Sequence, residues 1–353
     1  MKILHTSDLH LREYEDERWK TLLKLLEIGK QNNIEILAIS GDLFDNNIIA
    51  EELRPRLRSI FSQNKFKIVI IPGNHDKDSY KSGKYFGDDV VIIEDLNSPI
   101  ELENLRIWGM PFELIDREII LENLQNLKDK LKSDKQNILL FHGELLDTFF
   151  SRSDFGEEGE DRYMPIKLSY FKDLNFNYVL GGHFHSKFDI RQIDREKFFV
   201  YSGSPISITK KEIGKRKINL FELGKPPIEY PLDTPYFEKV KVEFDPIKDF
   251  DPINVVQNSL NNLPSYAKIS LTTSGYLNNA AIGMSETELK QKISEIIPEN
   301  CIEVDYAFKD ISEITEDDLF IKFLKKLNER DYSEERVKKM RDLTIKSMMR
   351  MGL

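Results

Sequence analysis

Cysteine is almost absent from this chain of 353 residues, which contains Cys301 and no other cysteine. A single cysteine excludes an internal disulfide bond, and it excludes a zinc site built from several thiolates. Such scarcity is typical of proteins that work in a reducing compartment. We therefore expect a cytoplasmic protein.

Long apolar runs are missing as well. No uninterrupted apolar stretch approaches the roughly 18 residues that a membrane-spanning helix needs. Near the N-terminus, Asp8 interrupts the apolar residues too early for the core of a signal peptide. We expect no association with a membrane.

The chain also lacks an excess of positive charge. The 51 Lys and Arg residues are outnumbered by 61 Asp and Glu, which gives a net charge of −10. Proteins that bind polyanions over their whole surface usually carry the opposite balance. Two segments depart from the average, with nine cations against four anions over 187–217 and ten against five over 321–353. Each is either a solvated face or a contact with nucleic acid, and the sequence leaves both open.

What the chain does contain is an alternation of apolar runs with amphipathic stretches. Near-continuous apolar runs over 2–8, 34–42 and 67–71 are separated by helical spacing over 16–31 and 49–62. This order predicts a parallel sheet with helices on its faces. Further strands are predicted at 90–96, 105–111, 137–141 and 178–182, a helix at 116–132, an exposed loop at 147–163, and antiparallel strands of a second sheet at 198–201, 217–223 and 228–230.

Four prolines between residues 224 and 235 predict a domain boundary, because proline is excluded from sheet interiors. After this boundary, the pattern predicts strand, helix, strand, helix and strand up to residue 308. The tail is predicted to be helical. Apolar residues repeat along one side of its first helix at Leu319, Phe320, Phe323, Leu324 and Leu327. A last, basic helix is predicted at 333–349, and its stripe either packs on its own domain or binds a partner. The residues of this second stripe are Val337, Met340, Thr344 and Met348.

Polar side chains that can bind metal follow five of the predicted strands, and these segments hold all six histidines. The candidate residues are Asp8, His10, Asp42, Asn74, His75, His142, His183 and His185. In sheets of this kind, functional groups collect at the carboxyl ends of the strands. Carboxylates, one amide and several imidazoles together suit manganese, iron or zinc. The set is large enough for two ions if Asp42 bridges them.

Each residue taken singly has an ordinary structural explanation. Asp8 and Asp42 could cap turns, Asn74 could be a turn residue, and His142 could be a hydrogen-bonded core histidine. His5 lies within the first strand, so we predict that it is buried and not a ligand. The joint occurrence of the others favours a two-metal centre for phosphoester hydrolysis. His75 follows a ligand directly, and it is predicted to donate a proton to the leaving oxygen.

These motifs resemble those of the calcineurin-like metallophosphoesterase superfamily, over residues 1 to about 205. The similarity is closest to the SbcD and meiotic-recombination-eleven nucleases, on residues 5–11, 41–45 and 201–205. The resemblance implies a four-layer α-β-β-α sandwich over 1–230, a small α/β capping and DNA-binding domain over 236–310, and a helical tail over 315–353. It also implies one metal on Asp8, His10, Asp42 and His185, a second on Asp42, Asn74, His142 and His183, and His75 as the catalytic histidine.

By the same resemblance, the protein would be a manganese-dependent DNA exonuclease and endonuclease in double-strand-break repair or DNA-end processing. It would form a homodimer and bind an SbcC-type coiled-coil ATPase through its tail. The chain departs from many relatives at Asp45, which replaces a second histidine. A phosphodiesterase or phosphatase for a small or nucleotide substrate is the alternative. A non-catalytic scaffold would have lost ligands, whereas every matched position here is intact.

Overall fold

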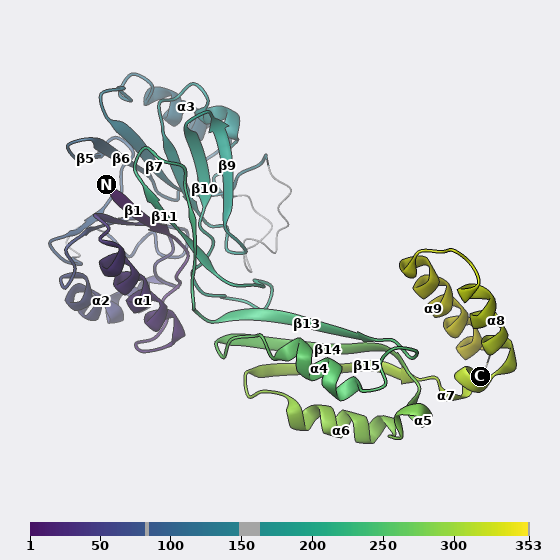
Figure 1. Cartoon of the computed structure of the whole chain (residues 1–353). Coiled ribbons are helices and arrows are strands. Elements are labelled where there is room, and N and C mark those ends of the chain that lie inside the picture. The colour runs from purple at the N-terminus through teal and green to yellow at the C-terminus, as the bar shows by residue number, and fades with distance from the viewer. Residues whose placement is uncertain (82–84, 148–162, 352–353) are drawn as a thin grey trace. The chain divides into compact units, whose positions relative to one another are not determined.

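The computed structural model describes residues 1–81, 85–147 and 163–351, and it divides into two compact units. The first unit is Met1–Phe237 and the second is Glu238–Leu353 (Figure 1). The second unit therefore contains both the segment predicted as a cap and the segment predicted as a tail. Separate roles for these two parts remain a prediction.

The first unit contains two six-stranded sheets, and the strands of the first sheet come from both ends of the unit. Its order is β12 (Glu229–Pro231), β11 (Lys217–Glu222), β1 (Lys2–Thr6), β2 (Ile36–Ser40), β3 (Lys67–Ile71) and β4 (Val90–Ile92). Strands β1 to β4 are parallel, while β11 pairs antiparallel with β1.

The second sheet is also mainly parallel. Its order is β5 (Ile100–Glu101), β6 (Leu105–Met110), β7 (Gln136–His142), β8 (Tyr178–Gly182), β10 (Lys197–Tyr201) and β9 (Asp189–Asp194). As predicted, β10 belongs to this sheet and pairs antiparallel with β9, but it is also parallel to β8. Strands β11 and β12 are antiparallel as predicted, but their predicted place in the second sheet was wrong, because they belong to the first. The reason lies in β11, where Ile218 packs in the core under the helices and Phe221 packs between the sheets. A strand with apolar side chains on both faces fits beside β1.

The layers follow from where the apolar side chains are buried. Helices α1 (Glu17–Asn32) and α2 (Asn47–Phe61) pack on the first sheet, while α3 (Arg117–Asn126) and the short helix η2 (Leu168–Phe171) pack on the second. A third core, with Ile36, Val69, Ile138 and Leu180 among its members, fills the space between the sheets. The predicted four-layer α/β sandwich is thus confirmed (Figure 1).

The second unit contains a three-stranded sheet in the order β13 (Tyr236–Phe244), β14 (Ala267–Leu277) and β15 (Cys301–Asp310). Helices α4 (Pro252–Leu260) and α6 (Glu286–Ile296) alternate with these strands, in the order predicted from the sequence. A capping box formed by Ser285 and Glu288 fixes the start of α6. A short helix, α5 (Asn279–Ile282), follows β14.

The chain ends in helices α7 (Ser312–Glu316), α8 (Asp318–Asn328) and α9 (Glu334–Arg350). The predicted apolar stripe of α8 is divided between two environments. Phe320 is buried in a cluster with Ile345 and Met348 of α9, whereas Leu319 remains 68% exposed. The stripe therefore packs on its own unit along one edge and faces solvent along the other.

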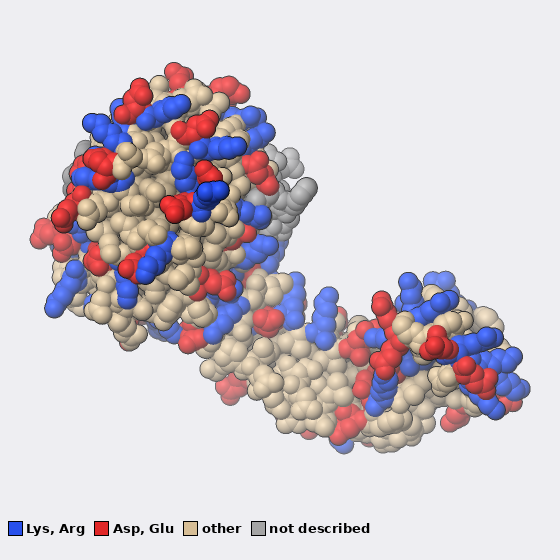
Figure 2. Space-filling model, turned by 45° about the horizontal axis from the view of Figure 1, so that its top comes forward, with Lys and Arg blue, Asp and Glu red and all other residues tan. Residues whose placement is uncertain are grey.

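Charged side chains of both signs are interspersed on the face shown in Figure 2. Most of the loop predicted at 147–163 lies outside the described residues. Among the helices that are described, none is long and apolar enough to cross a membrane.

Candidate metal centre

Loops at the carboxyl ends of β1 and β2 lie side by side and hydrogen-bond to each other. The amide of Asp8 donates to the carbonyl of Gly41 at 3.1 Å, and the amide of His10 donates to that of Asp42 at 3.0 Å. The parallel sheet is therefore extended by backbone pairing beyond the strands themselves. This pairing fixes the spacing between two of the predicted ligand segments.

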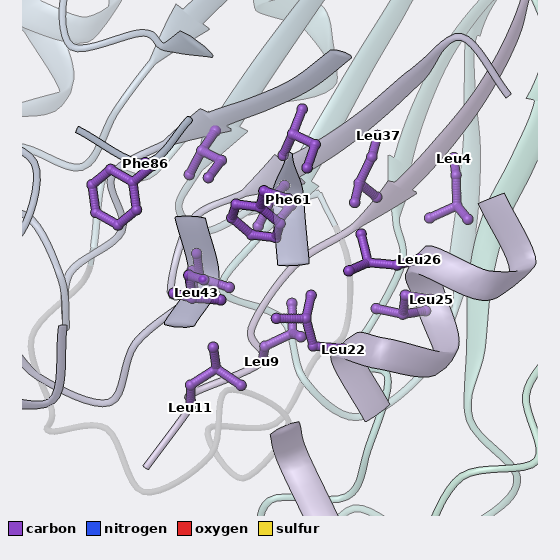
Figure 3. Close-up of a cluster of buried hydrophobic side chains, with 14 of the residues drawn as sticks. Leu4, Leu9, Leu11, Leu22, Leu25, Leu26, Leu37, Leu43, Phe61 and Phe86 are labelled. Atoms are coloured by element: carbon purple, nitrogen blue, oxygen red, sulfur yellow. The ribbon is translucent and has the colours of Figure 1, made fainter. Parts of the chain in front are cut away.

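Along these loops, residues with metal-binding side chains alternate with leucines that are buried in the core. Leu9, Leu11 and Leu43 are fully buried in the core under α1 and α2, where they lie near Leu22 and Leu25 (Figure 3). Asp8, His10 and Asp42 are the residues that precede these leucines, and their side chains gather at the candidate metal centre. Burial of the leucines contributes roughly 1.5–3 kcal/mol per side chain. The hydrophobic core thus holds the loops on which the polar groups sit.

Asp8, His10, Asp42 and His185 form one group, with a ligand atom from each lying within 4.8 Å of the others. The Nε2 atoms of His10 and His185 are 3.3 Å apart, and His185 Nε2 lies 3.6 Å from an oxygen of Asp8. The distance from His10 Nε2 to Asp42 Oδ2 is 3.7 Å. Most of these separations are longer than hydrogen bonds, and they match neighbouring ligands that share an ion with bonds of about 2.0–2.2 Å.

Asn74, His142 and His183 lie on the other side of Asp42. His142 Nε2 is 2.8 Å from Asn74 Oδ1 and 3.4 Å from Asp42 Oδ2, while the rings of His142 and His183 are 5.3 Å apart between centroids. The structure therefore brings all seven predicted ligands into one region, with Asp42 next to both groups. This is the placement that a bridging carboxylate requires.

The pKa shifts reflect burial opposed by these close charges. Burial alone would raise the pKa of Asp42, but His142 and His10 hold it below its ordinary value. Burial would lower the pKa of His142, yet the Asp42 carboxylate raises it to about 9. Burial lowers the pKa of His10 and raises that of Asp8. The site is a set of buried groups whose pKa values depend on one another through these close contacts.

The groups present fit divalent cations. Asp42 Oδ2 is buried and has no hydrogen-bond partner, although two imidazole nitrogens face it. His142 Nδ1 lies 2.8 Å from the carbonyl of Ser40, which directs Nε2 toward Asp42 and Asn74. Buried carboxylates and oriented imidazoles of this kind are the ligands of borderline metals.

The backbone at the candidate ligands is strained. Four of them have positive φ angles, namely Asp8 at 56°, His10 at 47°, Asp42 at 52° and His183 at 85°. Such conformations cost of order 1–3 kcal/mol each in residues other than glycine, and they cluster at functional sites. Strain at ligand positions is an independent indication that this region is the functional site.

Two glycines let the segments approach this closely. A Cβ atom on Gly182 would lie 1.9 Å from the carbonyl oxygen of Ser40, and one on Gly41 would lie 2.1 Å from His142 Nδ1. Gly41 also has a φ of 89°, which side chains disfavour. The glycines beside the ligands are thus required by the contacts between neighbouring strands.

His75 differs from the ligands because its side chain is exposed. Its amide donates to Asp42 Oδ1 at 2.9 Å, and its ring lies 4.7 Å from that of His10. Asp76 is buried below this loop, where it accepts hydrogen bonds from the amides of Gly73 and Phe44. Burial raises the pKa of Asp76 to about 6. His75 is thus held at the solvent side of the candidate metal centre.

Sequence reasoning missed several residues that support the site. Buried Glu212 lies 3.5 Å from His185 Nδ1. Exposed Arg12 and half-buried Arg18 pair with Asp45 at 3.0 and 3.3 Å. Asp45 also lies 3.9 Å from His10 Nδ1, so it neighbours a candidate ligand. A search for carboxylates able to orient the metal-binding histidines would have considered Glu212.

His5 is buried in β1 as predicted, with Nε2 3.1 Å from Ser40 Oγ. Burial lowers its pKa to about 3, below the unfolded value of about 6.5. The unfolded state therefore binds more protons between these values, and the free energy of unfolding decreases as pH is lowered through this window. We expect His5 to cost about 2–3 kcal/mol on going from about pH 7.5 to 4.5. Urea unfolding of metal-free wild type and His5→Gln checks this, and parallel pH curves would contradict it.

Comparison with known proteins places this site in a family. The family model described as calcineurin-like phosphoesterase matches residues 1–187, so the chain belongs to that family. The protein is therefore a metallophosphoesterase, a hydrolase with a candidate metal cluster of Asp8, His10, Asp42 and His185.

Two solved structures show weak overall similarity. A dimetal phosphatase from Danio rerio has 9% identity and a TM-score of 0.43, with 62% of this chain and 91% of that chain covered. A 5'-nucleotidase precursor from Thermus thermophilus has 12% identity and a TM-score of 0.38, with 66% of this chain and 54% of that chain covered. Similarity at this level carries no information on the substrate.

Proposed function

We propose that this chain is a DNA nuclease, with exonuclease and endonuclease activity, that acts in double-strand-break repair or DNA-end processing in the cytoplasm. The observation that carries the proposal is the cavity beside the candidate metal centre. This cavity has a volume of about 530 Å³, and its lining includes His10, His75 and His185 together with the cations Arg12, Arg18, Lys210 and Lys211. An acidic protein that places four cations around a phosphoesterase site is suited to a polyanionic substrate.

The site would hold two divalent ions, which we propose to be manganese. Asp8, His10, Asp42 and His185 would hold one, and Asp42, Asn74, His142 and His183 would hold the other. Two such ions lower the pKa of a bound water and stabilise phosphoryl oxygens during in-line attack.

The chain's own groups orient the substrate and move the proton. Arg12, Lys210 and Lys211 would bind phosphate oxygens next to the scissile group. His75, exposed beside the ligands, would donate a proton to the leaving oxygen. Since its amide donates to Asp42 Oδ1, the same loop positions a ligand and the proton donor.

A phosphodiesterase or phosphatase for a small or nucleotide substrate is the second candidate. The favouring observation is the cavity volume, because about 530 Å³ lies within the usual range of small-molecule sites. The metal ligands alone do not choose between the two. The proposed relationship to the SbcD and meiotic-recombination-eleven nucleases favours DNA.

The two candidate substrates are distinguished by substituting the cationic residues of the cavity and measuring activity on each substrate. With Mn²⁺, wild type should cleave duplex and hairpin DNA. The double substitution Lys210→Gln, Lys211→Gln should raise KM for DNA about tenfold or more and reduce its salt dependence, because two phosphate contacts are lost. Turnover of bis(p-nitrophenyl) phosphate should change less than about threefold.

The matched control is Lys215→Gln, Lys225→Gln, which removes the same charge from residues outside the lining of this cavity. Efficient turnover of a small ester or a nucleotide, with DNA left intact, would replace the nuclease proposal by the second candidate. Equal effects of the two double variants on DNA would mean that charge acts only through the overall field.

We also propose a homodimer and a coiled-coil ATPase of the SbcC type as partners. In support, α8 and α9 form an apolar groove of about 430 Å³ that includes Leu319 and Leu343, which are 68% and 57% exposed. Leu319→Asp, Leu343→Asp should abolish co-purification with the co-expressed ATPase and leave cleavage of short single strands unchanged. Leu114→Asp, at a residue 75% exposed in the first unit, is the control, and retained co-purification would refute the assignment.

A further inference from the structure

Glu212 is a buried carboxylate with contacts on two sides. Its Oε1 atom lies 3.5 Å from His185 Nδ1, and the same oxygen accepts from the amide and hydroxyl of Thr209, both at 3.2 Å. Its Oε2 atom accepts from the amide of Ile208 at 2.7 Å and from Ser204 Oγ at 3.1 Å. One side chain therefore touches a candidate metal ligand and holds the segment after Ser204.

That segment forms a wall of the cavity. Ile208, Thr209, Lys210 and Lys211 all line the space that His10, His75 and His185 also line. Besides the side-chain bonds, the Glu212 carbonyl accepts from Ser207 Oγ at 2.6 Å. The conformation of residues 207–211, and with it the position of two lysines, thus depends on Glu212.

Arg216 holds the backbone on either side of this arrangement. Its guanidinium is buried and donates to the carbonyl of Ser204 at 2.9 Å, to that of Ser186 at 2.8 Å, and to that of His185. The backbone of His185 is therefore fixed by Arg216, while its ring faces Glu212. What remains adjustable is the contact between His185 Nδ1 and Glu212 Oε1, which at 3.5 Å is longer than a normal hydrogen bond.

We propose that Glu212 is a positioning residue that couples metal binding at His185 to the conformation of residues 207–211. A cation on Nε2 makes the Nδ1–H of a histidine a better donor to a carboxylate, and such carboxylates typically change metal affinity about 10–100-fold. Because the same carboxylate accepts from Ile208 and Thr209, a stronger contact to His185 fixes it in the position from which it holds the segment. By linkage, ordering of the segment must strengthen metal binding in return.

The inference rests on metal binding at the candidate centre and not on DNA being the substrate. It predicts two readouts besides activity. Mn²⁺ should slow hydrogen exchange of the Ile208 and Thr209 amides in wild type, measured on a peptide spanning residues 204–213. Calorimetric titration with Mn²⁺ should resolve two equivalents in wild type.

In Glu212→Gln, we expect one Mn²⁺ equivalent to weaken by about 10–100-fold, faster exchange in residues 204–213, and no further slowing on addition of Mn²⁺. Thr209→Val removes the hydrogen bond from the Thr209 hydroxyl to Glu212 Oε1 and leaves His185 unchanged. It should speed exchange of the segment and weaken the same Mn²⁺ equivalent about two- to fivefold, as reciprocity requires. Glu229→Gln, an exposed carboxylate paired with Lys217, is the matched control.

Unchanged Mn²⁺ affinity and exchange in folded Glu212→Gln would overturn the inference. Faster exchange in Thr209→Val with unaltered Mn²⁺ affinity would also overturn it, because the segment would then be held independently of the metal. If Glu212→Gln does not fold, Glu212→Asp and Thr209→Val carry the test. A wild type that binds no Mn²⁺ would instead refute the proposed two-metal function, so the two failures are distinguishable.

Discussion

Asp42→Asn is expected to lower Mn²⁺-dependent phosphodiester hydrolysis by at least about a thousandfold. Asp42 Oδ2 faces His142 at 3.4 Å and His10 at 3.7 Å, so it is the carboxylate between the two ligand groups. An amide keeps its volume and the oxygen that accepts from the His75 amide, but it removes the negative charge. Both ions should bind more weakly, which steady-state rates and the number of Mn²⁺ ions bound at equilibrium would report.

Asp194→Asn, at an exposed carboxylate of β9, controls for the loss of one negative charge. Thermal unfolding should show that Asp42→Asn is folded, since the substitution leaves a similar shape in the core. Two bound ions with activity within about tenfold of wild type would contradict the role of Asp42 as the shared ligand.

The position of the site could be predicted from the sequence because strand ends follow from local patterns. Apolar runs ending in Gly-Asp or Gly-Gly-His give both the strand and the residue that leaves it. Parallel pairing then brings Asp8, Asp42 and Asn74 to one edge, whatever the details of the loops. The seven candidate ligands needed no information beyond this.

The supporting residues could not be found in the same way. Glu212 and Arg216 lie between strands and act on His185 through contacts of 3.5 Å or less, which no periodicity records. The sheet to which β11 belongs could not be predicted, because a strand with apolar residues on both faces suits either sheet. The stripe of α8 showed that an apolar face exists, but only the packing of Phe320 against α9 decided which edge is covered.

Backbone strain at the candidate metal centre lowers the stability of the first unit. Four candidate ligands in the left-handed region together cost several kcal/mol, and the glycines beside them tolerate no side chain. The leucines that follow Asp8, His10 and Asp42 offset this by packing in the core (Figure 3). A protein without a function for these groups would gain stability by relaxing them.

His75→Ala is expected to keep both Mn²⁺ ions and to lose turnover of DNA by about 10²–10⁴-fold. The side chain of His75 is exposed, and the link to Asp42 is made by the backbone amide, which alanine retains. Metal binding should therefore be nearly unchanged. Calorimetric titration with Mn²⁺ and single-turnover cleavage would measure the two effects separately.

The leaving group distinguishes proton donation from a general loss of structure. An alcohol leaving from DNA needs a proton, whereas p-nitrophenolate is stable without one. His75→Ala should therefore lower cleavage of bis(p-nitrophenyl) phosphate less than about tenfold while DNA cleavage falls by at least about a hundredfold. Lys77→Ala, at an exposed residue on the same loop, should affect neither substrate. Equal losses on both substrates, or loss of one Mn²⁺ ion, would show that His75 supports the metal centre and is not the proton donor.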